Sequence, residues 1–482
     1  MRTKTHIFLP LLLALTIVSA SVGGWLWYDN NVDRSGWVEK DGVRFYRDFY
    51  ADPVSGWLDL EDGRYYFHED GTPHTGWQSI EGITYYFNDT GTMHTGWLEL
   101  GGKLHYFGGN GAMVDGWLWL EDGRYYLRDG ALLTGWQEIE GGRYHFSDEG
   151  IATLGFAEID GNQYYFDNGI MATGLTTVDE KTYNFGDDGV LRTGWIDYDN
   201  GRRYFSPEGI MATGWQELEG SRYLFTEEGF PITGWHQEGE YHYYFLEDGR
   251  AAVGPNVIDG QVRYFSPKGI HVVLVNALNP VPDWFHLDAV NVVDYHDVDR
   301  LCYDALNQML ADLTAAGIEY TFNSAYRTIT EQTTILEYRT REHMKNFNLD
   351  FYEARNKAYE TVAVPGTSEH HLGLAVDLLG DAAVAWLTEH CWEYGFIVRY
   401  TEEKEPITGI VDEPWHFRYV GKEVSLDMKD SGLCLEEYLG AEAVSWDKVA
   451  AKFGDSLYQE TIWQPPASKP AEAATAPSEV TS

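Results

Sequence analysis

Two short stretches in the second half of the chain hold the residues whose types and spacing could do chemistry. Residues 366–377 read Gly-Thr-Ser-Glu-His-His-Leu-Gly-Leu-Ala-Val-Asp, and residues 413–421 read Glu-Pro-Trp-His-Phe-Arg-Tyr-Val-Gly. Their candidate metal ligands are His370, Asp377 and His416. Three nitrogen and oxygen donors with one open position are what a catalytic zinc ion requires, and such an ion lowers the pKa of its bound water to about 7. The two stretches therefore predict a hydrolytic zinc site.

The local sequence indicates how the first two ligands could meet. His370 and Asp377 are seven residues apart, so on one straight strand they would face opposite sides. Gly373 permits a bend that folds His370 back beside Asp377. Ala375 shares a face with Asp377, and its small side chain leaves room for an ion and a substrate. We expect a strand over residues 372–379 that follows this bend.

Glu413 is the candidate general base. It lies three residues before His416, and Pro414 pushes it toward extended backbone, so the pair is not on a helix. A free carboxylate beside a metal-bound water is the usual general base in such sites.

The elements around these residues predict one α+β domain. Helical spacing of apolar residues runs over 297–316, over 330–362 with a break near Asn348, and over 382–394. Strand-like stretches are residues 320–327, 396–400 and 416–420. Mixed helices and short strands describe a compact α+β fold, which we place at residues 274–442.

This half of the chain resembles the VanY-type D-alanyl-D-alanine carboxypeptidases, metallopeptidases that trim D-alanine from peptidoglycan stem peptides. Their pattern Ser-x-His-x-x-Gly-x-Ala-x-Asp is met in full from Ser368 to Asp377, and the Glu-Pro-Trp-His block is intact. The resemblance implies zinc on His370, Asp377 and His416, with Glu413 as base and then proton donor. It implies that Arg327 stabilises the oxyanion or grips the substrate carboxylate, and that Ser368, Gln332 and Tyr326 line the substrate site. Arg418, in the second motif, is a rival candidate for the role of Arg327.

Three alternative functions remain open at this point. The same zinc site serves L,D-carboxypeptidases and peptidoglycan endopeptidases, because the shape of the pocket decides between them. From a different class, the protein could be a wall adhesin that carries an inert peptidase-like domain.

A repeat of 19 or 20 residues fills residues 36–270. Each unit has a Gly-Trp pair, a short run, an acidic-Gly turn signal and a second aromatic run, as in residues 56–67. Two short aromatic runs joined by such a turn predict a β-hairpin, and one hairpin cannot bury its own face. Stacked copies build a continuous core, so we expect a β-hairpin solenoid.

The repeats resemble the choline-binding and glucan-binding modules of Gram-positive cell-wall proteins, which implies binding of a wall polymer or glycan on aromatic rings. The tryptophans we assign to a wall ligand are Trp57, Trp77, Trp97, Trp117, Trp195 and Trp215. Choline cages have a second Trp just before the Tyr-Tyr pair, and here that position holds Arg64, Thr84, Leu104, Arg124, Arg143 or Gln163. These copies lack one aromatic ring of the choline cage, and several place an arginine there instead, so we leave the wall ligand unspecified.

Composition and the two ends of the sequence limit the partners and the location that the protein can have. The net charge of −42 argues against nucleic acid as a partner and against docking on anionic lipid.

Basic residues followed by an apolar run predict a signal peptide at residues 1–24, with an uncleaved membrane anchor as the alternative. Either places the rest outside the cytoplasm, in association with the cell wall. Residues 465–482 consist mainly of Pro, Ala, Ser, Thr and Glu, have almost no apolar content to bury, and should be disordered. Cys302, Cys391 and Cys434 fit no zinc knuckle, and we expect buried thiols.

Overall fold

The computed structural model describes residues 33–458, which fall into two compact units. Unit 1 ends at Gly194 and also takes in residues 207–210, and unit 2 contains the remainder. The segments that we predicted as a signal peptide or anchor (1–24) and as a disordered tail (465–482) lie outside the described residues. Within the described part of the chain, no helix is long and apolar enough to cross a membrane.

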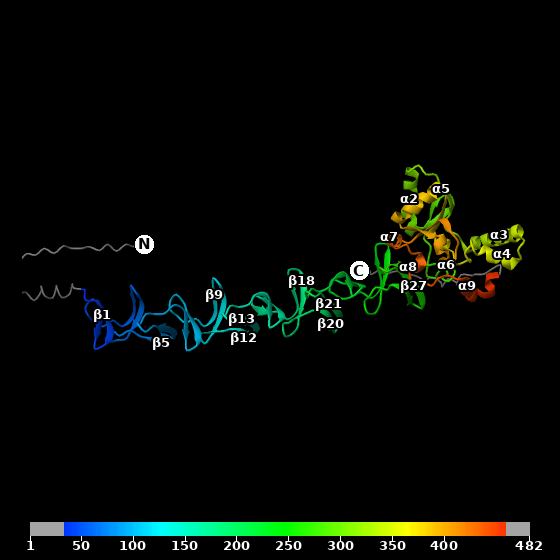
Figure 1. The fold of residues 1–482 in the computed structure, drawn as a ribbon. Coiled ribbons are helices and arrows are strands. Elements are labelled where there is room, and N and C mark those ends of the chain that lie inside the picture. Colours follow the sequence, from blue (N-terminus) through cyan, green and yellow to red (C-terminus); the bar gives the residue numbers. More distant parts are fainter. Residues whose placement is uncertain (1–32, 459–482) are drawn as a thin grey trace, which may run out of the picture. The chain divides into compact units, whose positions relative to one another are not determined.

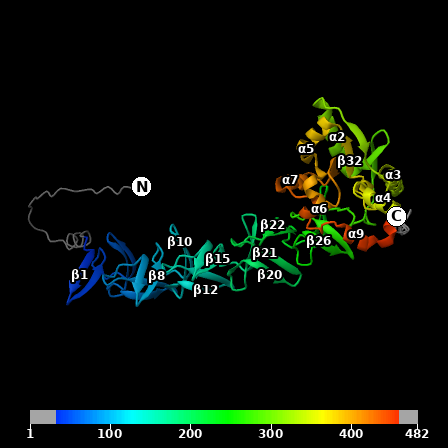
Figure 2. The same cartoon turned by 45° about the vertical axis from the view of Figure 1, so that its right-hand side comes forward.

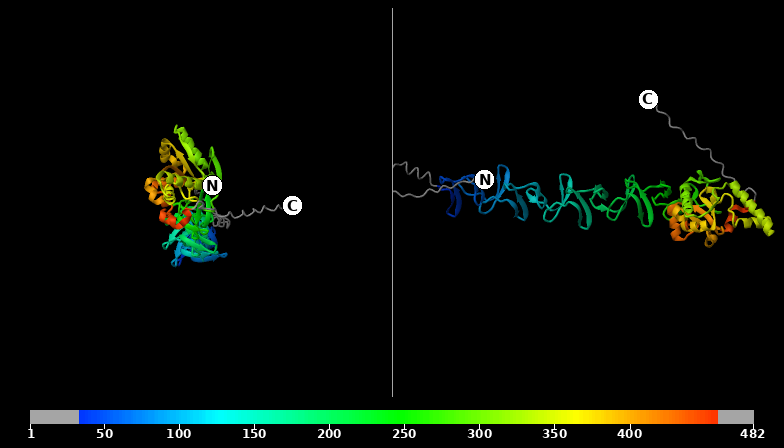
Figure 3. Two further views of the ribbon diagram at one scale, coloured as in Figure 1. Left: turned by 90° about the vertical axis from the view of Figure 1, so that its right-hand side faces the viewer. Right: turned by 90° about the horizontal axis from the view of Figure 1, so that it is seen from above.

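Unit 1 is a succession of antiparallel hairpins that follow one another along the unit (Figures 1 and 3). The hairpins are β1 (Gly36–Lys40) with β2 (Val43–Arg47), β3 (Gly56–Leu60) with β4 (Gly63–Phe67), β5 (Gly76–Ile80) with β6 (Ile83–Phe87), and β7 (Gly96–Leu100) with β8 (Lys103–Phe107). They continue with β9 (Gly116–Leu120), β10 (Gly123–Arg128) and β11 (Ala131–Leu132), β12 (Gly135–Ile139) with β13 (Gly142–Phe146), β14 (Gly155–Ile159), β15 (Asn162–Asp167) and β16 (Ile170–Met171), and β17 (Gly174–Val178), β18 (Lys181–Phe185) and β19 (Leu191–Arg192). The predicted hairpin repeat is therefore confirmed.

Aromatic rings join each hairpin to the next. The Trp57 ring lies 5.0 Å from Tyr66 of its own hairpin and 5.0 Å from Tyr85 of the following hairpin. Phe87, on the same strand as Tyr85, is fully buried. Tight turns set the register: Glu81 and Gly82 both have positive φ, the type I′ geometry that matches the twist of a two-residue hairpin. Each hairpin thus completes the core of its neighbour.

Unit 2 begins with further hairpins. These are β20 (Gly194–Tyr198) with β21 (Gly201–Phe205), β22 (Gly214–Leu218) with β23 (Ser221–Phe225), β24 (Gly234–Glu238) with β25 (Tyr241–Phe245), and β26 (Gly254–Ile258), β27 (Gln261–Phe265) and β28 (His271–Val272). The α+β part of the unit follows them.

A four-stranded sheet forms the centre of the α+β part. Its order is β31 (Thr321–Ser324), β32 (Ala375–Leu379), β34 (Glu413–Tyr419) and β33 (Phe396–Tyr400), with antiparallel neighbours throughout. A separate hairpin comprises β29 (Ala289–Val293) and β30 (His296–Asp299). The main core packs α2 (Arg300–Ala315) and α5 (Asp381–His390) with this sheet, and Figure 2 shows the two helices beside β32.

Six further helices and four 3-10 turns complete the described part of the domain. They are α3 (Ile329–Phe347), α4 (Phe351–Ala358), α6 (Glu405–Thr408), α7 (Lys422–Ser431), α8 (Leu435–Tyr438) and α9 (Trp446–Phe453), with 3-10 turns at Glu369–Leu372, Cys391–Tyr394, Glu402–Lys404 and Gly454–Tyr458. The expected break near Asn348 is present, because this residue ends α3 in the left-handed conformation. Helices α3 and α4, yellow in Figures 1 and 3, lie side by side. All three cysteines are buried and unpaired.

The last hairpins of unit 2 share a hydrophobic core with its α+β part. Tyr243 and Ile270 belong to one buried cluster with Ile397, Val424 and Leu435. Two hydrogen bonds cross the same junction: Tyr419 donates to Glu240 at 2.6 Å, and the Glu423 N–H donates to the Tyr241 hydroxyl at 3.1 Å. The boundaries that we predicted, 36–270 and 274–442, remain predictions, and packing across the junction is continuous.

Candidate active site

The two central strands bring the second and third predicted ligands face to face. Asp377 on β32 and His416 on β34 are register partners in the sheet. His370 lies on the 3-10 turn Glu369–Leu372, just before β32. The expected bend is present at Gly373, whose φ is 64°. A Cβ at this position would lie 2.8 Å from the Asp299 backbone nitrogen, so only glycine fits.

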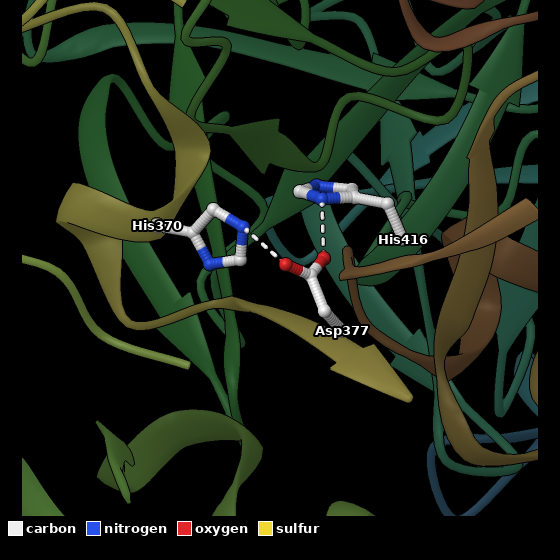
Figure 4. Close-up of side chains that lie close together, drawn as sticks. All are labelled: His370, Asp377 and His416. Atoms are coloured by element: carbon white, nitrogen blue, oxygen red, sulfur yellow. Dashed lines mark hydrogen bonds and ion pairs between the residues drawn. The ribbon is translucent and has the colours of Figure 1, made fainter. Parts of the chain in front are cut away.

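The three side chains form one buried cluster (Figure 4). His370 Nε2 lies 3.3 Å from Asp377 Oδ2, and His416 Nδ1 lies 3.0 Å from Asp377 Oδ1. One ligand atom from each residue lies within 4.8 Å of the others. The relative exposures of His370, Asp377 and His416 are only 4%, 6% and 4%. Two imidazole nitrogens and a carboxylate in this arrangement fit the donor set of a zinc ion.

Hydrogen bonding fixes which nitrogen of His370 is available. Its Nδ1 lies 2.7 Å from the Ala325 carbonyl oxygen, which can only accept, so Nδ1 carries the proton. The unprotonated Nε2 then faces the cluster as a ligand atom. A backbone acceptor behind a histidine ligand is a recurrent feature of protein metal sites.

Charge within the cluster favours an ionised aspartate. Burial alone would raise the pKa of Asp377, but the two histidines hold it well below its usual range. Burial lowers the pKa of His370. His416 behaves differently: burial opposes its charged form, yet the neighbouring carboxylates of Asp377 and Glu369 raise its pKa to about 9. The aspartate thus provides the negative charge that a divalent cation would meet.

Glu413, at the start of β34, opens into the same cavity as the cluster. The extended backbone expected beside Pro414 is present. Burial raises the pKa of Glu413 to about 7, although His416 and Arg327 oppose the shift. A carboxyl group with this pKa can both accept and return a proton near neutral pH.

Arg327 is the cation that faces the cluster. Its Nη2 lies 3.9 Å from Asp377 Oδ2, and its guanidinium donates to Gln332 Oε1 at 2.7 Å and to Ser324 Oγ at 2.8 Å. The rival, Arg418, is 1% exposed and is engaged by Glu369 and by backbone carbonyls. Arg327 is therefore held in place at the cavity while Arg418 is committed to the interior.

The cavity has a volume of about 620 Å³. Of the three residues predicted to line the substrate site, Ser368 and Gln332 line this cavity, whereas Tyr326 lines a neighbouring pocket of about 420 Å³. That pocket shares Arg327 with the cavity. Sequence reasoning missed several further lining residues, namely Asn323, Arg339, His343, Tyr400 and Trp415. They come from segments outside the two motifs or from spacer positions within them, so no spacing rule marked them.

His371 plays a structural part. Its Nε2 accepts a hydrogen bond from the Gly366 N–H at 3.1 Å, so its Nδ1 donates to the Arg327 carbonyl oxygen, 2.6 Å away. Both ring nitrogens are therefore used within the fold, and burial lowers its pKa to about 4. Neither ring nitrogen of His371 is therefore free to hold a metal ion.

The tryptophans of the repeats fall into two groups. A guanidinium lies over the ring of Trp57 (Arg64, 4.5 Å), Trp195 (Arg202, 4.0 Å) and Trp215 (Arg222, 4.3 Å) among the predicted wall-ligand residues, and likewise over Trp37 (Arg44, 3.6 Å) and Trp136 (Arg143, 4.5 Å). Among the residues from 33 to 458, no cation covers Trp77, Trp97 or Trp117 in this way. These three belong to consecutive hairpins, β5 to β10.

The register of the hairpins distinguishes the tryptophans whose rings are covered by an arginine from Trp77, Trp97 and Trp117, whose rings are not. The residue two positions after Trp lies opposite the residue before the aromatic run, as in Asp59 opposite Arg64 and Glu138 opposite Arg143. In two of these hairpins the acid also forms an ion pair with the arginine: Arg64 Nε lies 3.4 Å from Asp59 Oδ1, and Arg143 Nε lies 3.9 Å from Glu138 Oε1. In the uncovered hairpins, the opposed pairs are Ser79 with Thr84, Glu99 with Leu104, and Trp119 with Arg124. No acid–arginine pair occurs in these three.

Fold and site together define the class: a β-hairpin repeat array followed in the chain by an α+β peptidase domain. The sequence profile of the VanY family, described as D-alanyl-D-alanine carboxypeptidase, matches residues 295–422. A choline-binding repeat profile matches residues 74–117 and 172–213, and a cell wall binding repeat profile matches residues 134–152 and 155–169.

Individual relatives agree with these profiles. The chain is 37% identical to a D-alanyl-D-alanine carboxypeptidase of Enterococcus faecalis over 36% of its own length and 66% of that protein. It is 38% identical to VanXYC of Enterococcus gallinarum, a bifunctional D-Ala-D-Ala dipeptidase and carboxypeptidase, over 26% of its own length and 69% of that protein. A solved structure of the D,D-pentapeptidase VanY with Zn(II) is 37% identical and covers 35% of this chain and 97% of that one, with a TM-score of 0.34.

The chain therefore belongs to the VanY family of D-alanyl-D-alanine carboxypeptidases. It also carries choline-binding-like repeats. It spans just under two thirds of the length of the Enterococcus faecalis relative.

Proposed function

We propose that this protein is a zinc-dependent carboxypeptidase that removes the terminal D-alanine from peptidoglycan stem peptides. The observation that carries the proposal is the cluster of His370, Asp377 and His416, whose ligand atoms lie within 4.8 Å of one another in the cavity that also holds Glu413 and Arg327. Zinc bound there would supply Lewis-acid polarisation of the scissile carbonyl and a water of lowered pKa.

The protein's own residues then handle the protons and the charge. Glu413 takes a proton from the attacking water, whose oxygen bonds to the carbonyl carbon of the penultimate residue. Arg327, held by Gln332 and Ser324, stabilises the negative charge that develops on the carbonyl oxygen or binds the terminal carboxylate. Glu413 returns the proton to the leaving amine as the C–N bond breaks. One water is consumed and free D-alanine leaves.

Product masses from three substrates test this specificity. The protein is incubated with stem pentapeptide, stem tetrapeptide and cross-linked dimer. Loss of one alanine from the pentapeptide alone supports the D,D-carboxypeptidase. Cleavage of the tetrapeptide or the dimer would instead identify the L,D-carboxypeptidase or the endopeptidase, and no cleavage of any substrate would favour the wall adhesin.

We further propose that the repeats hold the enzyme at the cell wall, outside the cytoplasm, with the wall ligand on the uncovered rings of Trp77, Trp97 and Trp117. A guanidinium already stacks where an external group would sit on Trp57, Trp195 and Trp215. Displacing Arg64 from Trp57 would also break its ion pair with Asp59. The three uncovered faces carry no such cost. A tether of this kind raises the local concentration of enzyme at its substrate.

A further inference from the structure

Glu369 occupies the spacer position between Ser368 and His370 in the first motif. Its side chain has no exposed surface. One carboxylate oxygen, Oε1, accepts a hydrogen bond from Arg399 Nε at 2.8 Å and lies 3.0 Å from Arg418 Nη1. The other, Oε2, lies 3.5 Å from His416 Nε2. The spacer residue therefore sits directly behind a predicted metal ligand.

The facing atoms of Glu369 and His416 are both buried without a formed hydrogen bond. Neither Glu369 Oε2 nor His416 Nε2 has a partner among the described residues. Their separation of 3.5 Å is longer than the usual N–H···O distance of about 2.9 Å. Buried polar atoms left unpaired are costly, and each of these two lies in reach of the other.

The chemistry of imidazole links this pair to the metal cluster. The cluster faces Nδ1 of His416, which lies beside Asp377 Oδ1. A neutral imidazole that offers the lone pair of Nδ1 carries its proton on Nε2. That proton then points at Glu369 Oε2. The two histidines thus present opposite nitrogens to the cluster, and the outer nitrogen of His370 has the Ala325 carbonyl oxygen as its acceptor.

On the basis of the proposed zinc site, we propose that Glu369 is a positioning residue that accepts the Nε2 proton of His416 and thereby aims Nδ1 at the ion. Glu369 acts through His416 rather than on the substrate. An acceptor behind a histidine ligand fixes its tautomer and ring orientation and increases its basicity.

The surroundings of Glu369 are built to hold its carboxylate still. Arg399 also donates to Glu436 at 2.9 Å and 2.6 Å, and Asn276 donates to Glu436 at 3.0 Å. Arg418 donates to the Val273 carbonyl oxygen at 2.6 Å. Two buried carboxylates thus meet two buried guanidiniums and their charges balance, as buried ion pairs require.

Glu436 provides a matched control, because it belongs to the same buried network but makes no contact with His416. Glu369→Gln and Glu436→Gln each remove one buried carboxylate charge. The full-length protein and both variants are titrated with zinc against a chromogenic chelator. Visible spectra of the Co(II)-substituted proteins report the ligand geometry. Thermal unfolding monitors the fold.

We expect Glu369→Gln to weaken zinc binding about 10- to 100-fold and to shift the Co(II) bands. Glu436→Gln should lower the unfolding temperature but leave zinc affinity and the Co(II) spectrum close to wild type. If Glu369→Gln does not fold, Glu369→Asp serves, since it keeps the charge but withdraws the carboxylate from His416 by one methylene. It should weaken zinc binding in the same direction.

Wild-type zinc affinity and spectrum in the folded Glu369 variant would overturn the proposal, as would an equal loss of zinc affinity in Glu436→Gln. Turnover of stem pentapeptide by the wild-type protein is measured in parallel. Its absence, together with zinc binding that depends on Glu369, would contradict the proposed peptidase function and leave the positioning role standing.

Discussion

The hairpins of unit 1 and the cavity of unit 2 both place charged side chains beside the groups that we propose bind ligands, but the two regions assemble these groups differently. Where an arginine covers the tryptophan ring, Trp57, Asp59 and Arg64 all lie on the two strands of one hairpin, and copies of this set recur along the array. In the cavity, Arg327, His370 and His416 come from three segments and occur once. The array should therefore lose function gradually as copies are altered, whereas the cavity should fail when a single residue is changed.

Glu413→Gln should give the largest loss of activity. It tests the expectation that the cavity fails when a single residue is changed. Glutamine cannot accept the proton from water, so we expect kcat to fall about 10²- to 10⁴-fold while zinc binding is retained. Stem-peptide turnover and zinc titration of the variant check both parts. Near-normal turnover would remove Glu413 from the mechanism.

Arg327→Ala should give the next largest effect. The guanidinium that faces Asp377 at 3.9 Å is lost, and with it the donor for the developing oxyanion or the substrate carboxylate. We expect kcat/KM to fall about 10²- to 10³-fold. A fall in kcat alone would assign Arg327 to the oxyanion, and a rise in KM alone would assign it to the carboxylate. Unchanged kinetics would exclude both roles.

The pH profile follows from the pKa of Glu413, which burial raises to about 7. A zinc ion held beside Glu413 would lower this pKa from its metal-free value. The base form is lost as the pH falls through the pKa, so we expect kcat/KM to drop about tenfold per unit on an acid limb at or below pH 7. The same shift in the pKa of Glu413 affects the stability of the metal-free protein with the opposite dependence on pH. A raised folded-state pKa stabilises the metal-free fold at low pH, and this contribution is lost as the pH rises through about 7. Glu413→Gln should therefore raise the unfolding temperature of the metal-free protein at pH 8, and no gain there would contradict the shift.

Substitution of single tryptophans should give the smallest effects, here on binding to cell walls. It tests the expectation that the repeat array loses function gradually. Each of Trp77→Ala, Trp97→Ala and Trp117→Ala should weaken binding to purified walls by roughly 0.5–1 kcal/mol, or about 2- to 5-fold. The matched control is Trp57→Ala, whose ring already carries Arg64. Sedimentation with walls measures both, and an equal loss in the control would show that the covered faces bind as well.

Much of this organisation was predictable from sequence because it depends on local rules. The hairpin repeat followed from its period, the bend at Gly373 from the lack of a Cβ, and the extended Glu413 from Pro414. The break at Asn348 is likewise a local backbone event. Each of these needs only a few neighbouring residues.

Features that depend on distant partners were not predictable in the same way. Glu369 looks like a spacer in the motif, because Arg399, which donates to its carboxylate, lies 30 residues further along the chain, and Glu436 lies a further 37 residues beyond Arg399. Tyr326 adjoins Arg327 in sequence but lines a different pocket, since consecutive side chains leave the backbone in different directions. The arginine over each covered tryptophan depends on a cross-strand pair whose register only the fold makes visible.

The most direct test of the central claim is the mass of the product formed from stem pentapeptide with and without a metal chelator. We predict release of a single D-alanine, its loss on chelation, and its recovery when zinc is restored. Turnover that survives complete removal of metal, or zinc restoration that revives no cleavage of the pentapeptide, would contradict a peptidase built on His370, Asp377 and His416.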